Sequence, residues 1–209
     1  MATGVLVIGA ANFDIKGRML HPPVLMSSNA SAMRTSFGGV ARNIAENLAR
    51  LGMPVTLITA VGDDYAGENI LESAAEIGID TSRALVVENE VTGTYFAALD
   101  EQGDLYLGLD DLRVLRHLTP EYLRTHREAF QSCDLVALDM NLSEAALREA
   151  IHLVHEYSKP LCVDPTSAML ASRLRPYLSL INIVTPNLTE AEELLRCAPI
   201  RSPAEALQA

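Results

Sequence analysis

The chain has 209 residues, and 49% of them are hydrophobic, which is enough to bury a sizeable core within one domain. Its formal net charge is −11, so nucleic acids and anionic membranes would be repelled at long range, and we expect neither as a partner. Small molecules are the expected partners. Anionic ones are not excluded, because helix N-termini and Mg2+ can hold phosphates on an acidic protein.

The cysteines indicate a reducing environment. Cys133, Cys162 and Cys197 are odd in number and show no CxxC spacing, which favours neither a disulfide framework nor a zinc site. The apolar stretch 5–11 follows no cationic segment and is too short to cross a bilayer. We therefore expect a cytoplasmic protein.

Predicted strands and helices alternate along most of the chain. The segment 4–9 is apolar and β-branched on both faces, which is typical of a parallel strand covered by helices on both sides. A helix is predicted to begin after Gly38-Gly39 and to stop at Gly52. The other predicted strands are 55–61, 84–87, 135–138, 161–163 and 181–184, and the other predicted helices are 65–77, 120–131, 143–157 and 189–196. This alternation predicts an α/β fold with right-handed βαβ units.

Two segments depart from the βα rhythm. The segment 12–36 contains Pro22-Pro23 and the cluster Ser27-Ser28-Asn29, which do not suit a central strand, so we interpret it as irregular, a short edge hairpin or flap. The segment 92–109 is predicted to form two short strands, 94–99 and 105–109, joined by a turn that ends in Gly103.

The first candidate site follows the first strand. Asn12 and Asp14 come just beyond its carboxyl end, where ligands bind in open α/β sheets, and their side chains suit sugar hydroxyls. The alternative is an Asx turn at the strand exit. A GxGxxG motif is absent here, which disfavours a dinucleotide fold.

The second candidate site is the start of the helix after Gly38 and Gly39. Two glycines allow a close approach of backbone to a ligand, and free N–H groups at the helix start add donors. Asn43, one turn into the helix, would face the same opening as Asp14. The alternative is a tight helix entry with Asn43 exposed to solvent.

The third candidate site follows the strand 181–184. Asn187 and Glu190 offer an amide and a carboxylate that suit hydrated Mg2+. The alternative is an ordinary helix start, with Thr189 and Glu192 as a capping box.

Two further polar groups follow predicted strands. Asp164 follows 161–163, and the pair Asp139 and Asn141 follows 135–138. The five histidines show no HExxH or other paired metal spacing.

The order of these motifs resembles the ribokinase-like, PfkB-type family of carbohydrate and nucleoside kinases over essentially the whole chain. The matching segments are GAANFD (9–14), GGVARNIAENLARLG (38–52), AVGDDYAGE (60–68), VDP (163–165) and PNLTEAE (186–192). In detail the chain is most similar to the pseudouridine kinases, in GAANFDIKG, LTPEYL (118–123), DMNLSEAAL (139–147) and VDPTSA (163–168). Ribokinase, fructokinase and adenosine kinase share the coarser motifs.

The resemblance implies a three-layer α/β/α sandwich with a mostly parallel sheet and a small β lid, formed by segments of about 15–36 and 92–110. It implies transfer of the γ-phosphoryl group of ATP to a hydroxyl of a sugar or nucleoside, and for this chain the conversion of pseudouridine to its 5′-phosphate. It also implies Mg2+ as cofactor and a homodimer formed through the lid. The residues implied to hold the sugar are Asn12, Asp14, Gly38, Gly39, Asn43 and Asn141. Those implied on the nucleotide side are Asp164, Asn187 and Glu190, and Glu190 would hold the metal through water.

One family motif has no counterpart in these 209 residues: the DTxGAGD-like stretch that supplies the oxyanion-hole backbone and the aspartate base. The resemblance therefore implies that residues 1–209 form the N-terminal part of a kinase domain. Without the base and the anion hole, the chain by itself is expected to be inactive. The alternatives are a non-catalytic remnant that binds a sugar or nucleoside, and another kinase of the family.

Overall fold

A computed structural model describes residues 4–197, 199–201 and 205. Its large sheet has six strands in the order β12-β11-β10-β1-β4-β6, and all neighbouring pairs are parallel. The strands are β1 (Val5–Ile8), β4 (Val55–Ile58), β6 (Ile79–Asp80), β10 (Leu135–Asp139), β11 (Leu161–Asp164) and β12 (Ile183–Val184). The predicted mostly parallel sheet is confirmed.

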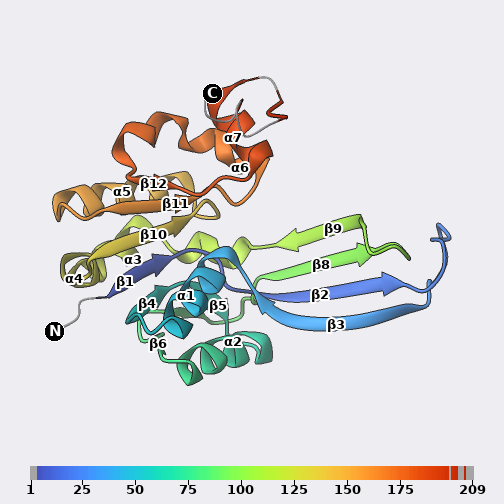
Figure 1. Ribbon diagram of the computed structural model, residues 1–209. Coiled ribbons are helices and arrows are strands. Elements are labelled where there is room, and N and C mark those ends of the chain that lie inside the picture. Colours follow the sequence, from blue (N-terminus) through green and yellow to red (C-terminus); the bar gives the residue numbers. More distant parts are fainter. Residues whose placement is uncertain (1–3, 198, 202–204, 206–209) are drawn as a thin grey trace.

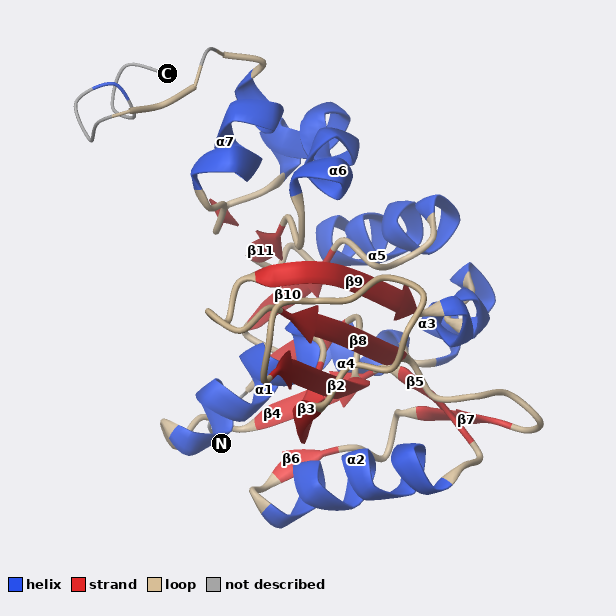
Figure 2. Ribbon diagram, turned by 90° about the vertical axis from the view of Figure 1, so that its right-hand side faces the viewer, coloured by secondary structure: helices blue, strands red, loops and turns tan. Residues whose placement is uncertain are grey.

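Helices cover both faces of the large sheet (Figures 1 and 2). Side chains of β1 alternate between the two: Val5 and Val7 pack in the core that includes α1, whereas Leu6 and Ile8 pack in the core that includes α3, α4 and α5. The helices are α1 (Val40–Arg50), α2 (Tyr65–Glu76), α3 (Pro120–Thr125), α4 (Arg127–Ser132), α5 (Glu144–Glu156), α6 (Ala168–Ala171) and α7 (Leu188–Leu195), with 3-10 turns at Arg113–His117 and Ser172–Leu180. The result is a three-layer α/β/α sandwich.

A second sheet of four strands projects from the sandwich as an arm (Figure 1). We call it the small sheet; its order is β3-β2-β8-β9, from β2 (Asn12–Met19), β3 (Ser31–Gly38), β8 (Thr94–Leu99) and β9 (Leu105–Asp111). The hairpin predicted at 94–109 is confirmed. The segment 12–36 forms a hairpin at the edge of this sheet, as considered, but it is neither irregular nor short, because β2 and β3 are eight-residue strands and β2 is interior.

The residues of β2 have the alternating pattern of a strand, which the interpretation of 12–36 overlooked because Pro22 and Pro23 follow closely. Residues 12–19 read NFDIKGRM, in which polar and apolar or small residues alternate strictly, as in a strand with two different faces. Pro22 and Pro23 lie in the connection between β2 and β3 rather than in either strand. They therefore interrupt no strand ladder.

Several predicted boundaries are corrected. The predicted strand 55–61 divides at Thr59, where the chain leaves the large sheet, and β5 (Ala60–Gly62) pairs instead with β7 (Leu85–Val87). The predicted helix 120–131 is two helices, α3 and α4, which meet at His126. The helical stretch between β11 and β12 was not predicted. The predicted helix stop at Gly52 is confirmed by its φ of 82°, and Gly78, with φ of 88°, follows α2 in the same way.

Within the described ranges, no helix combines the length and apolarity needed to cross a bilayer.

Candidate functional site

A cavity of about 310 Å3 lies where the small sheet joins the carboxyl ends of β1 and β10. It brings together five of the predicted sugar-binding residues, which lie far apart in sequence. The lining residues are Asn12, Asp14, Gly39, Val40, Asn43, Tyr95, Asp110, Leu112, Asn141 and Thr166. We call it the junction cavity.

Asn12 and Asp14 present their side chains from the same face of β2. The Asn12 amide Nδ2 donates a hydrogen bond to Asp14 Oδ1 at 2.6 Å, and Asn12 is almost fully buried. The Asx turn considered for this segment does not occur, because both residues belong to a strand. Asp14 Oδ2 lies 3.5 Å from the ammonium of Lys16, so each oxygen of the carboxylate has a partner on β2.

The two glycines that precede α1 are required by close packing. A β-carbon at Gly38 would lie 2.4 Å from Asp14 Oδ1, and one at Gly39 would lie 2.3 Å from the carbonyl oxygen of Ala10. Gly39 also has φ of 94°, which L side chains rarely adopt. The N-terminus of α1 can therefore approach the cavity closely. Gly39 has no side chain to cap it, but the N–H groups of Ala41 and Arg42 are engaged by Asp139 Oδ2 and by the carbonyl oxygen of Ala10.

Asp139 is a fully buried carboxylate at the exit of β10, predicted from the sequence only as a polar residue after a strand, with no role assigned to it. Its Oδ2 accepts hydrogen bonds from the N–H groups of Ala10 at 2.7 Å and Ala41 at 3.0 Å, and its Oδ1 accepts one from Asn141 at 2.9 Å. Burial raises the pKa of Asp139, and these three N–H groups act against that rise. One side chain thus joins the exits of β1 and β10 to the start of α1.

Thr166 joins the exits of β10 and β11. Its Oγ1 accepts the N–H of Met140 at 3.0 Å, and its own N–H donates to Asp164 Oδ1 at 2.8 Å. Its φ is 68°, a strained value for a β-branched residue. No signal in the sequence pointed to Thr166, Tyr95, Asp110 or Leu112 as lining residues, because each enters the cavity only through tertiary packing.

The residues predicted on the nucleotide side do not line the junction cavity. Asp164 Oδ2 accepts the hydroxyl of Thr185 at 3.0 Å. Asn187 and Glu190 form a reciprocal capping box at the start of α7: the Glu190 N–H donates to Asn187 Oδ1 at 2.9 Å, and the Asn187 N–H donates to Glu190 Oε2 at 2.9 Å. The alternative of an ordinary helix start is borne out, but its capping residues are Asn187 and Glu190 rather than Thr189 and Glu192, because α7 begins one residue earlier than predicted.

The geometry of Glu190 bears on the predicted metal contact. Its Oε1 accepts from the Asn187 amide at 2.8 Å, so both carboxylate oxygens are engaged and the side chain is buried. Each oxygen keeps a second lone pair, which suits a contact with Mg2+ through water better than direct ligation. Among the described residues, no group of three or more His, Cys, Asp and Glu side chains gathers to hold a metal ion.

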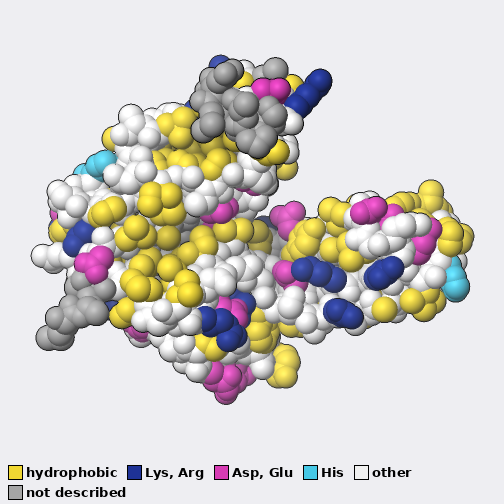
Figure 3. All heavy atoms as spheres, viewed as in Figure 1, with side chains coloured by type: hydrophobic (Ala, Val, Ile, Leu, Met, Phe, Trp, Pro, Cys, Tyr) yellow, Lys and Arg dark blue, Asp and Glu magenta, His cyan; other side chains and the backbone are white. Residues whose placement is uncertain are grey.

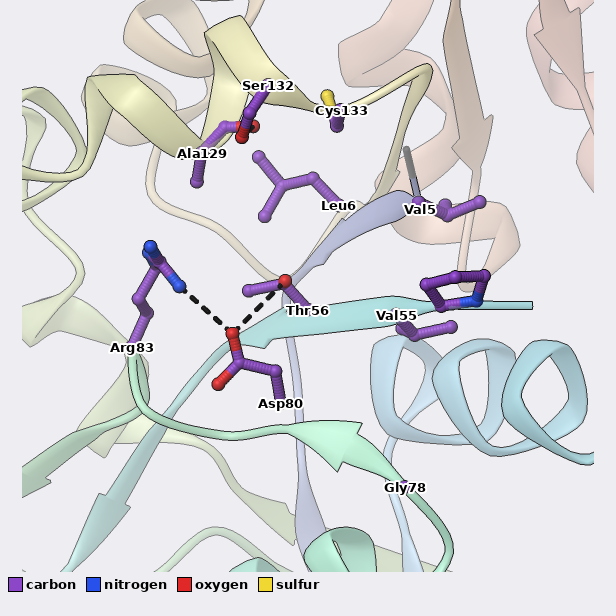
Figure 4. Close-up of a pocket in the computed structure, with 12 residues that line it drawn as sticks. Val5, Leu6, Val55, Thr56, Gly78, Asp80, Arg83, Ala129, Ser132 and Cys133 are labelled. Atoms are coloured by element: carbon purple, nitrogen blue, oxygen red, sulfur yellow. Dashed lines mark hydrogen bonds and ion pairs between the residues drawn. The ribbon is translucent and has the colours of Figure 1, made fainter. Parts of the chain in front are cut away.

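Another cavity, of about 370 Å3, lies at the amino ends of β1 and β4 (Figure 4). There Asp80 Oδ2 accepts from Arg83 at 3.0 Å and from the Thr56 hydroxyl at 3.4 Å (Figure 4). None of the predicted site residues lines it. In open α/β sheets ligands bind at the carboxyl ends of the strands, which favours the junction cavity as the functional site.

The architecture, a mostly parallel α/β/α sandwich with a projecting β sheet, is that of ribokinase-like kinases. A carbohydrate kinase from Agrobacterium tumefaciens superposes with a TM-score of 0.82 at 32% identity, covering 91% of this chain and 62% of that one. A ribokinase from Arabidopsis thaliana, solved in complex with ribose and ATP, superposes with a TM-score of 0.80 at 22% identity, covering 100% of this chain and 67% of that one. The model of the pfkB family of carbohydrate kinases matches residues 2–209, and the chain belongs to this family.

The chain is also similar in sequence to a kinase of named substrate. The chain is 36% identical to the pseudouridine kinase of Escherichia coli (strain K12) over 190 residues, which are 91% of this chain and 60% of that protein. The chain therefore spans about three fifths of the length of this relative.

Proposed function

We propose that this protein is a kinase that transfers the γ-phosphoryl group of ATP to a hydroxyl of a nucleoside, with pseudouridine as the acceptor, and that residues 1–209 carry its sugar-binding part. The observation that carries the proposal is the junction cavity, in which Asn12, Asp14, Asn43 and Asn141 converge in a member of the pfkB family. The similarity to a pseudouridine kinase supports the choice of acceptor.

The chemistry of the junction cavity suits a polyhydroxylated ring. Asp14 can accept hydrogen bonds from two neighbouring hydroxyls, and the amides of Asn43 and Asn141 can both donate and accept. Val40 at the start of α1 lines the cavity and its N–H adds a donor, and the glycines before it let the backbone come close to a ligand. Gly38 contributes by leaving room for the Asp14 carboxylate.

ATP and Mg2+ supply the phosphoryl group and neutralise its charge when they are bound. We assign Asp164, Asn187 and Glu190 to that side of the site, with Glu190 contacting the metal through water. The general base remains a prediction for the DTxGAGD-like stretch of the family. Closure of the small sheet as a lid over the acceptor would exclude water, which competes as a phosphoryl acceptor.

The first experiment is calorimetric titration of this chain with pseudouridine and with D-ribose. We expect binding that Asp14→Ala weakens at least about 10-fold, because a charged acceptor of two hydrogen bonds is lost. Asp104→Ala, at an exposed position in the β8–β9 turn, is the control and should bind normally. Absence of binding to every nucleoside and sugar tried would overturn the proposal.

Turnover separates the kinase from the alternative of a non-catalytic binding protein. A protein extended through the DTxGAGD-like stretch should consume ATP when pseudouridine is added. Binding without ATP consumption in that longer protein would favour the binding remnant. Consumption with ribose or another nucleoside alone would indicate a different kinase of the family.

We also propose that the lid mediates a homodimer in the cytoplasm. The small-sheet face opposite Asp14 exposes Met33, Leu107 and Leu109, each about half exposed, and an apolar face of this kind favours contact with a second copy. All three cysteines are free, which agrees with a reducing compartment. Sedimentation should show a dimer that Leu107→Glu dissociates; a wild-type monomer at all concentrations would contradict it.

A further inference from the structure

Two cations lie directly opposite each other beside the sugar-binding carboxylate. On β2, Asp14, Lys16 and Arg18 share one face because side chains alternate along a strand, and the register of β2 with β3 pairs Lys16 with Arg34. Like charges in opposite positions of a ladder destabilise it. Lys and Arg side chains are prominent on the projecting arm (Figure 3), although the chain as a whole has a net charge of −11. A locally unfavourable arrangement of this kind is expected at functional sites.

These cations line a cavity of about 490 Å3 that follows the junction cavity along the small sheet. We call it the lid cavity. Lys16 connects the two cavities, since its ammonium lies 3.5 Å from the Asp14 carboxylate. The lid cavity is lined by Lys16, Arg18, Met19, Leu20, Ala32, Arg34, Leu99 and Glu101.

The polar groups of the lid cavity are mainly donors. Lys and Arg side chains can only donate hydrogen bonds. Arg18 already donates to the carbonyl oxygen of Glu101 at 2.6 Å, whereas the Arg34 guanidinium makes no hydrogen bond or ion pair within the part of the chain that the structure describes. The Glu101 carboxylate accepts from the side chain of Gln102 at 3.1 Å. Apolar side chains supply the rest of the lining, so the cavity suits a flat group whose edge carries acceptors.

We propose that the lid cavity holds the base of the acceptor nucleoside, and that Lys16 and Arg34 select a pyrimidine with two ring carbonyls by donating hydrogen bonds to them. This inference rests on the proposed sugar site at Asp14. Two residues of strand span about 6.6 Å, which matches the offset between a ribose and the far edge of an attached pyrimidine ring. A cytosine base, which has an amino group in place of one carbonyl, would present a donor to these donors.

The test is calorimetric titration of wild type and of Arg34→Met with uridine, pseudouridine, cytidine and D-ribose. Arg34→Met keeps most of the side-chain length and removes the donors, and the structure shows no contact of this guanidinium with Asp14. We expect about 10- to 100-fold weaker binding of uridine and pseudouridine, as for a lost charged hydrogen bond, and unchanged binding of ribose. Lys16→Met should act in the same direction. Arg50→Met, on the outer face of α1, is the control that should change nothing.

The outcomes are distinguishable. Unchanged uridine and pseudouridine binding in Arg34→Met, or an equal loss for ribose, would overturn the inference while leaving the sugar site in place. If wild type binds cytidine as tightly as uridine, the proposed selectivity for two ring carbonyls is wrong. Inorganic phosphate that binds in an Arg34-dependent manner, without affecting nucleoside binding, would show an anion site instead. Failure of wild type to bind both ribose and nucleosides would overturn the proposed function itself.

Discussion

A β-carbon placed on Gly9 would lie 2.3 Å from the carboxyl carbon of Asp139. Gly9 directly follows β1, and Asp139 is the last residue of the neighbouring strand β10. The absence of a side chain at Gly9 therefore makes room for a buried carboxylate at Asp139. That carboxylate in turn holds the start of α1 through the N–H of Ala41. The geometry of the junction cavity therefore depends on this contact.

Gly9→Ala should destabilise the protein more than Gly52→Ala, although both glycines have positive φ. Gly9 has φ of 149°, and the added methyl also collides with Asp139. Backbone strain and overpacking together predict a loss of roughly 2–6 kcal/mol in the free energy of unfolding. Gly52→Ala is the matched control, since Gly52 has φ of 82° but no neighbouring atom within 4 Å of the place that an added methyl would take. Urea denaturation of both variants measures the difference; an equal loss would contradict the steric account.

Asp139→Asn should weaken sugar binding without any contact between residue 139 and the ligand. The amide has one acceptor where the carboxylate has two, so at least one of the N–H groups of Ala10, Ala41 and Asn141 loses its partner. An unsatisfied buried donor predicts a loss of about 1–3 kcal/mol in stability. Calorimetry with ribose should show a larger Kd even at temperatures where the variant is fully folded. Normal ribose affinity in a folded variant would show that Asp139 is structural only.

Asp64 should make the stability depend on pH in the acid range. Burial raises its pKa, but hydrogen bonds from Thr92 and from the N–H of Gly67 outweigh that effect and leave the pKa below its usual value. A carboxyl with a depressed folded pKa contributes stability that is present above its unfolded pKa, near 4, and is lost as pH falls through the folded pKa. Asp64→Asn should therefore be less stable than wild type at neutral pH, and the difference should shrink below about pH 4.

Urea unfolding of wild type and Asp64→Asn between neutral and acid pH checks this. Asp63→Asn is the neighbouring control, because Asp63 accepts the N–H of Asn89 and does not cap α2. A stability difference that does not change with pH would refute the assignment to Asp64.

Asn187→Ala should destabilise the start of α7. It removes the oxygen that caps the Glu190 N–H and the amide that donates to the Glu190 carboxylate. Loss of such a cap predicts about 0.5–2 kcal/mol. Glu190→Gln, which keeps an oxygen for the Asn187 N–H, should cost less. Thermal unfolding of both variants measures this order, and a reversed order would mean that the Glu190 charge, not the capping box, stabilises the helix.

The sequence alone determined most strands of the large sheet and the strand ends at which the candidate site was predicted. Buried parallel strands are continuously apolar, glycines stop the helices, and ligand-binding side chains follow the carboxyl ends of strands, so these features are local and readable. The family resemblance grouped Asn12, Asp14, Gly39, Asn43 and Asn141 as one predicted sugar site, and these five residues line one cavity.

Tertiary structure decided what depends on partners distant in sequence. The strand β2 is interior only because β8 pairs with it, and Tyr95 and Asp110 line the junction cavity only through that register. The burial of Asp139 depends on the missing side chain at Gly9 and on the N–H groups of two other segments. The pairing of Lys16 with Arg34 likewise exists only in the β2–β3 register. Sequence patterns report one segment at a time, whereas these relationships arise from hydrogen bonding and packing between segments.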